Sequence, residues 1–210
     1  MSADPLKSWL VALSCFSLAA CATQSQTASL QCGVGGAVVG YALCKALGRP
    51  DGECARAAAV IGAGGAAICY SYASNLERRR KELAGHENDL NRRIQYVHGL
   101  NQDTEQLNKD LSSRVAAVTQ DTDTLVAQIQ QRRVTQEQLA KARQARDSDV
   151  KQAELQVAKG REALTEVKTY RAQLKQPSAD LDVAIAKQQQ LYDDAEHQVQ
   201  LLAAQRARVG

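Results

Sequence analysis

Hydrophobic side chains recur at helical spacing through most of the chain, from Ser74 to the C-terminus. Two rows at seven-residue spacing, one starting at Leu76 and the other at Ile94, are mostly apolar between residues 76 and 129 and again between about 150 and 185. Such a heptad repeat is typical of a coiled coil. We therefore predict an all-α, elongated fold with a coiled coil over residues 74–176.

The repeat is interrupted near the middle of this region, where polar residues fall on the two rows. These residues are Arg132, Gln136, Arg143 and Arg146. A register shift or a fold-back is expected there. Pro177 is incompatible with a helix interior, and Ser178 is a suitable N-cap after the break. We therefore expect a separate C-terminal helix over residues 178–208.

The pattern leaves the path of the chain open. One unbroken helix from residue 74 to 176 would extend about 150 Å. Alternatively, the chain folds back near Gly99, near residues 133–135 or at Pro177. A lone helix cannot bury its own apolar stripe, so the stripe is expected to pair with another part of the chain, a second copy or another protein, unless it is a solvated single helix. Asn101 and Asn108 on the seam are expected to fix the register or the partner.

Residues 1–20 have a different pattern. Lys7 precedes an apolar run, Trp9–Ala20, of about a dozen residues. That length suits the core of a signal peptide and is too short to cross a bilayer as a helix, which takes roughly 20 residues. We predict that residues 1–20 are an export signal.

The run ends in Leu18-Ala19-Ala20-Cys21, which resembles the lipobox of bacterial lipoproteins. The resemblance implies cleavage before Cys21, a diacylglycerol on its thiol and an acyl chain such as palmitate on its new amino group. Several acyl chains on one residue suffice for stable anchoring. Ala22, in place of Asp, implies an outer-membrane protein that faces the periplasm. The alternative is an ordinary signal peptide with a Cys at its cleavage site.

After a polar linker, residues 21–31, two segments rich in small residues flank a turn at residues 48–53. Gly36 and Gly40 in the first segment, and Gly62 and Gly65 in the second, fall on stripes that let two helices approach closely. The region 32–73 resembles the glycine-zipper domain of bacterial envelope lipoproteins, which implies a short antiparallel helical hairpin. A flexible Gly-rich linker is the alternative, and the many Val and Ile side chains disfavour it.

The cysteines of the hairpin constrain its register. If both segments are helical, Cys32 and Cys44 lie about 18 Å apart, beyond the reach of a disulfide, and Cys54 and Cys69 fail in the same way. The nested pairs Cys32–Cys69 and Cys44–Cys54 fit one antiparallel register. We predict these two disulfides, which an oxidising periplasm would preserve.

The sequence does not decide whether the hairpin enters the bilayer. Each segment is marginal in length for spanning, and the turn carries charges that would have to cross. A hairpin at the membrane surface and an inserted hairpin both remain open. The basic run Arg78-Arg79-Arg80-Lys81 fits either contact with anionic head groups or a solvated helix face.

Charge and composition exclude several functions. The net charge of +3 is too small to indicate nucleic-acid binding, and aromatic residues make up only 4% of the chain. His86, His98 and His197 lie far apart, and we expect them to be surface residues. No catalytic, phosphate-binding or metal-ligand spacing is present. We expect no enzymatic activity, no small-molecule substrate, no metal and no cofactor other than the lipid on Cys21.

The order of lipobox, zipper and heptads leads to a functional hypothesis. We expect a structural or accessory lipoprotein of the cell envelope that contacts membrane lipid and that self-associates or binds another envelope protein through its coiled coil. One alternative is an oligomer of glycine-zipper hairpins inserted in the membrane. Another is an accessory lipoprotein of a secretion or conjugation system.

Overall fold

The computed structural model describes residues 64–175 and 177–209, which form four α-helices and, within these ranges, no strand. The helices are α5 (Gly64–Leu83), α6 (Leu90–Gln130), α7 (Gln136–Gln173) and α8 (Ala179–Ala207). The prediction of an all-α fold is confirmed. The export signal, Cys21, the linker 21–31 and the hairpin up to Ala63 lie outside the described residues.

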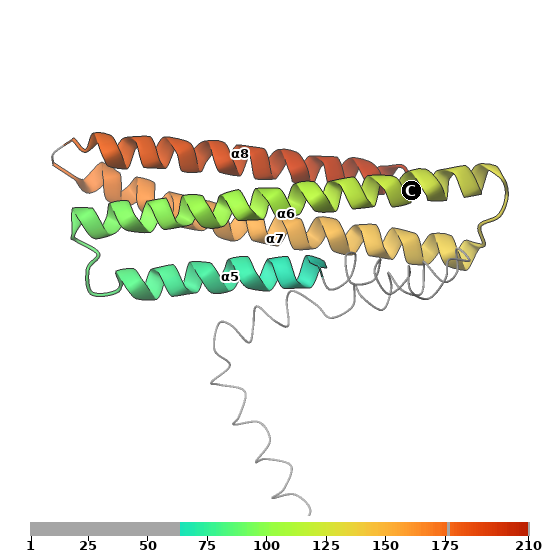
Figure 1. Cartoon of the computed structure of the whole chain (residues 1–210), viewed down its shortest axis with the longest axis horizontal. Helices are drawn as coiled ribbons and strands as arrows, with labels where there is room; N and C mark the ends of the chain where they lie inside the picture. Colours follow the sequence, from blue (N-terminus) through green and yellow to red (C-terminus); the bar gives the residue numbers. More distant parts are fainter. Residues whose placement is uncertain (1–63, 176, 210) are drawn as a thin grey trace, which may run out of the picture.

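The four helices pack side by side in an up-down-up-down bundle (Figure 1). Around the bundle the order is α5, α6, α8, α7, since α8 packs on α6 and α7, and α5 packs on the same two helices from the other side. α6 and α8 are therefore parallel neighbours, although α7 separates them in the sequence. α5 is about half as long as its neighbours, and α6 and α7 continue beyond its N-terminal end (Figure 1).

The chain folds back at two of the three positions that the sequence suggested. Residues 131–135 connect α6 to α7, and Arg132 adopts a left-handed conformation there, with φ of 56°. The second turn contains Pro177, after which the Ser178 hydroxyl accepts a hydrogen bond from the Leu181 N–H as the N-cap of α8. Ser178 therefore holds the N-cap position of a separate last helix.

The third suggestion, a fold-back near Gly99, is wrong. Gly99 lies buried inside α6, where the guanidinium of Arg79 passes over it. The turn lies ten residues or more earlier, around Gly85, whose φ of +81° favours glycine. Asp89 then caps α6 by accepting hydrogen bonds from the N–H groups of Asn91 and Arg92.

The heptad rows form the core of the bundle. Leu76, Leu83, Val97, Leu111, Val118, Leu125, Val167 and Leu181 are all buried and all belong to the row that starts at Leu76. Each such burial stabilises the fold by about 1.5–3 kcal/mol. The helices of the chain therefore cover the apolar stripe of one another. The described residues form a packed bundle and not a long unpaired helix.

α5 runs without a break across residues 73 and 74, the expected boundary between hairpin and coiled coil. Tyr72 and Leu76, on either side of that boundary, are both 4% exposed and pack in the bundle core. The last part of the small-residue region is thus the first part of a bundle helix.

Candidate functional site

A buried polar layer crosses the middle of the bundle and joins α5, α6 and α8. The Tyr72 and Tyr192 hydroxyl oxygens lie 2.7 Å apart, and the Gln188 side-chain amide donates to the Thr104 hydroxyl at 2.8 Å. Thr104 in turn donates to the Leu100 carbonyl at 2.8 Å. Because every hydroxyl of this layer has a partner, the layer fixes how three helices meet.

The tyrosines of this layer are poor acids. Burial, followed by the nearby Tyr192, raises the pKa of Tyr72 well above its usual range, and burial also raises the pKa of Tyr192. Both side chains therefore remain protonated at neutral pH. The layer therefore joins α5, α6 and α8 through neutral hydroxyl and amide groups.

Two asparagines set the register between α6 and α8. Asn101 donates from its side chain to the Ala184 carbonyl at 3.2 Å, and Asn108, one heptad later, donates to the Leu191 carbonyl at 2.9 Å. Both bonds join residues 83 positions apart, so the same register holds over two heptads. Sliding one helix along the other would leave both amides without these partners. Both residues were expected to fix the register or the partner, and in the structure they fix the register of α6 against α8.

A second buried polar layer lies farther along α6 and α7 and is ionic. Arg114 pairs with Asp149, and Arg146 lies 3.6 Å from Asp149 and 3.9 Å from Asp121. Arg146 is 1% exposed, although its place in the heptad row had suggested a defect. Burial lowers the pKa of Arg146 and raises that of Asp149, because desolvation disfavours both charges.

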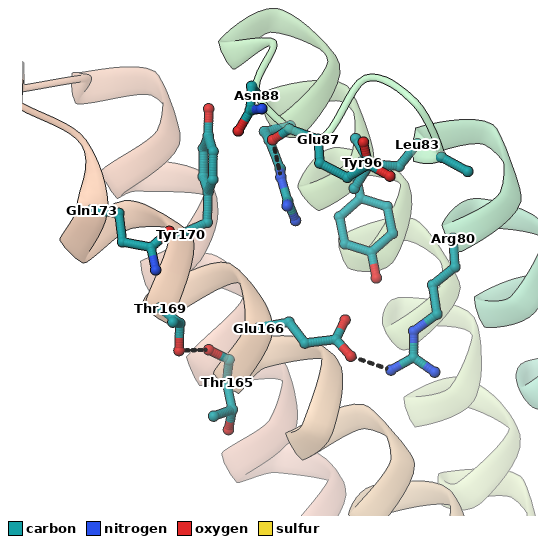
Figure 2. Close-up of a pocket in the computed structure, with 12 residues that line it drawn as sticks. Arg80, Leu83, Glu87, Asn88, Tyr96, Thr165, Glu166, Thr169, Tyr170 and Gln173 are labelled. Atoms are coloured by element: carbon teal, nitrogen blue, oxygen red, sulfur yellow. Dashed lines mark hydrogen bonds and ion pairs between the residues drawn. The ribbon is translucent and has the colours of Figure 1, made fainter.

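A cavity of about 520 Å³ lies near the turn between α5 and α6, and residues of α7 close its other side (Figure 2). Arg80 pairs with Glu166 across it at 2.7 Å, and the Arg93 guanidinium stacks over the Tyr170 ring at 4.4 Å. Burial, then the charge of Glu166, raises the pKa of Tyr96 in its wall to about 12.

The polar groups of this cavity do not converge on one point. The Tyr96 hydroxyl points toward Arg80 and Glu166, whereas the Tyr170 hydroxyl points toward Asn88 at the turn (Figure 2). The Tyr170 hydroxyl has no hydrogen-bond partner among the described residues. The cavity therefore has the size of a small-molecule site, roughly 300–1,000 Å³, without the focused set of polar groups that such sites use.

All four cations of the basic run on α5 have carboxylate partners. Arg78 and Lys81 pair along the helix with Glu82 and Glu77, at 2.9 Å and 2.8 Å. Arg79 pairs with Asp103 on α6 at 3.0 Å, and Arg80 pairs with Glu166 as described above. Two of the four therefore connect α5 to its neighbours, which favours a structural role for the run over contact with lipid head groups.

The other predicted site residues are only partly described. Gly65 of the zipper face and Cys69 of the predicted Cys32–Cys69 disulfide lie in α5. Cys21, Gly36, Gly40, Gly62 and the remaining cysteines lie outside the described residues, so the anchor and both disulfides stay predictions. His86, His98 and His197 are exposed and far apart, as expected of surface histidines.

Within the described ranges, no three His, Cys, Asp or Glu side chains come together as a metal site. No helix there has a stretch that is both long and apolar enough to span a bilayer. Comparison with known protein families, curated proteins and solved structures finds no match to this chain.

Neither the cavity nor the buried ionic layer could be recognised in the sequence. Arg146 and Asp149 have the three-residue spacing of neighbours on one helix face, but Arg114 is distant in the sequence, so the cluster could not be recognised. Arg146 lies on an otherwise apolar heptad row, and from the sequence this polar position predicted an interruption of the coiled coil. In the structure the row continues and the charge of Arg146 is buried in the core.

Proposed function

We propose that the chain is an outer-membrane lipoprotein, held by lipid on Cys21 and facing the periplasm, whose helical bundle is a structural or accessory module of the cell envelope with no catalytic role. The observation that carries this proposal is the apolar run that ends in Leu18-Ala19-Ala20-Cys21. The absence of converging reactive groups in the described bundle supports a module that binds or spaces other components.

The packing of the bundle changes where a partner would bind. Because α5, α6, α7 and α8 bury the heptad stripe among themselves, another envelope protein would contact the outer faces of the bundle rather than its seam. Self-association would use the same outer faces. The expected protein partners are still a second copy of the chain or another envelope protein, and they would bind on the outer faces of the bundle.

The anchor is tested by Cys21→Ser in the bacterial host, with Cys15→Ser as the matched control. Cys15 lies inside the segment that cleavage would remove, so its substitution should change nothing. We expect Cys21→Ser to abolish incorporation of labelled palmitate and release the protein from the membrane fraction. Globomycin, which blocks the lipoprotein signal peptidase, should cause the unprocessed precursor to accumulate. Acylation that persists in Cys21→Ser would contradict the proposal.

A second candidate is a membrane-inserting oligomer of glycine-zipper hairpins. The small-residue stripes through Gly36, Gly40 and Gly62 favour it. Alkaline carbonate extraction of Cys21→Ser separates the two candidates. Retention in the membrane pellet would support insertion, and release would support anchoring by lipid alone. Crosslinking in cells, followed by identification of the bound protein, tests the further alternative of a secretion or conjugation accessory.

A further inference from the structure

The cavity beside the turn between α5 and α6 has two arginines in its wall, and only one of them is paired with a carboxylate. Arg80 is neutralised by Glu166, at 2.7 Å between their charged atoms. Arg93, on α6, has no carboxylate partner among the described residues, and its Nε donates to the Glu87 backbone carbonyl at 2.9 Å. The two terminal nitrogens of Arg93 therefore have no acceptor in the described part of the chain.

The guanidinium of Arg93 is nevertheless held in place. It lies over the Tyr170 ring, 4.4 Å from the ring centroid, and its Nε is bonded to the turn. A guanidinium held in this way is a planar fork of N–H donors, which matches the two oxygens of a carboxylate. Because the side chain is already ordered, an anion that binds to it pays little for fixing its position.

A second unused polar group lies on the same tyrosine. Tyr170 is 8% exposed, and its hydroxyl, which points toward Asn88 (Figure 2), has no hydrogen-bond partner among the described residues. A buried hydroxyl without a partner is unfavourable. Since the Arg93 guanidinium stacks on the ring that carries this hydroxyl, both unused donors lie at the end of the cavity next to the turn.

The wall beyond these two groups offers apolar surface. Leu83 is 7% exposed and Tyr96 5%, and both line the cavity together with Ala84. An apolar body can lie against these side chains while one polar group of the same ligand reaches the turn. Such a ligand needs one charged anchor, and it does not need polar groups that converge from several sides.

The charges around the cavity favour an anion with a single negative charge. Arg80 and Glu166 cancel, which leaves Arg93 as the available cation and Glu87 as an acidic neighbour in the wall. A carboxylate carries one charge, which Arg93 alone can neutralise. A phosphate monoester carries about two at neutral pH, and the second would face the two glutamates without a cation of its own.

We propose that this cavity is a binding site for a monocarboxylate with an apolar body, whose carboxylate lies on Arg93 and accepts a hydrogen bond from the Tyr170 hydroxyl. Such a site goes beyond the proposed function, because it adds a small ligand to a module that otherwise binds lipid and protein. It does not depend on the lipid at Cys21, so its failure would leave the anchor proposal unaffected.

Phenylacetate is a suitable probe, because it carries one carboxylate on an aromatic body, and phenylacetamide is its uncharged counterpart of similar shape. Saturation-transfer NMR during titration of each probe into the full chain, purified from the host, measures the two dissociation constants. We expect a Kd of about 1 mM for phenylacetate and at least fivefold weaker binding of phenylacetamide. Equal binding of the two probes, or no binding of phenylacetate, would overturn the site.

The position of the carboxylate is tested by Arg93→Gln, with Arg92→Gln as the matched control. Arg92 is the exposed neighbour of Arg93 and does not line this cavity, so its substitution removes the same charge elsewhere. We expect Arg93→Gln to weaken phenylacetate binding at least fivefold and Arg92→Gln to leave it unchanged. Tyr170→Phe, which keeps the ring beneath Arg93, should weaken binding about threefold.

Equal affinity of Arg93→Gln and Arg92→Gln for phenylacetate would overturn the assignment of the carboxylate to Arg93. Unchanged binding by Tyr170→Phe would overturn the contact with the hydroxyl. If Arg93→Gln does not fold, the comparison of the two probes on the unaltered protein still decides whether the cavity recognises a carboxylate.

Discussion

Gly160 on α7 leaves room for the Tyr192 side chain of α8. A Cβ atom added there would lie only 2.6 Å from the Tyr192 hydroxyl oxygen and still closer to the ring. Tyr192 cannot move aside without losing its 2.7 Å contact with Tyr72 in the buried polar layer. Gly160 therefore follows from the packing of α7 on α8, and its place inside a heptad row does not mark a helix end.

Gly160→Ala should destabilise the protein although alanine is the better helix former. The gain in helix propensity is about 1 kcal/mol, and overpacking against a held ring costs typically 1–3 kcal/mol or more. Gly99→Ala is the matched control, because there the atoms nearest to the added Cβ belong to the guanidinium at the flexible end of Arg79. We expect urea unfolding to show a net loss of up to about 2 kcal/mol for Gly160→Ala alone. Equal stability of the two variants would contradict the close approach.

The buried tyrosines predict loss of stability at alkaline pH. Burial raises the pKa of Tyr96 to about 12, and the pKa values of Tyr72 and Tyr192 also lie above their ordinary value. A raised folded-state pKa contributes stability that is complete below the unfolded value near 10 and is lost as the pH rises toward 12. Absorbance at 295 nm and circular dichroism should therefore change together above pH 10. Early ionisation of all tyrosines with the helices intact would refute this.

At the scale of the helices, the sequence predicted a helix end best where residues next to that end determine it. Pro177 and Ser178 ended one helix and began the next, because a missing N–H and an N-cap hydroxyl act on adjacent residues. The turn around Gly85 was missed and assigned to Gly99 instead. Gly85 and Gly99 are the same residue type, so the glycine alone does not show which of them lies in a turn. The nearby sequence distinguishes them only through Asp89, which follows Gly85 and caps α6.

Thr135 begins α7 with a reciprocal capping box. Its N–H donates to the Gln138 side chain at 2.7 Å, and its hydroxyl accepts from the Gln138 N–H at 3.2 Å. Thr135→Ala should cost about 1 kcal/mol, and Thr135→Ser should retain most of the stability. The midpoint of urea unfolding measures both. A midpoint unchanged by Thr135→Ala would mean that the cap does not hold the turn.

At the scale of the whole molecule, the ionic layer of Arg114, Arg146 and Asp149 holds charges inside a helical core. Heptad positions normally bury apolar side chains, and a buried ion pair often stabilises no more than apolar residues of the same volume. We predict that the layer contributes more to the choice of one arrangement of helices than to the free energy of folding.

Asp149→Ala should be one of the most destabilising single changes, because it leaves two arginines buried without their shared carboxylate. We expect a loss of about 3–5 kcal/mol. Replacing Arg114, Arg146 and Asp149 together with Met, Met and Leu should restore most of that stability. Thermal unfolding followed by circular dichroism compares the variants. A triple variant less stable than Asp149→Ala would show that the layer stabilises the fold through its charges.

The sequence by itself determined the helical class, the heptad rows, the separate last helix and the residues, Asn101 and Asn108, that fix a register. These features depend on periodicity and on neighbours a few positions away. Only the tertiary structure decided what covers the apolar stripe, that α6 lies parallel to α8, and that Arg146 is buried beside Asp149. Those facts depend on contacts between residues far apart in the chain, and one heptad pattern is compatible with many partners.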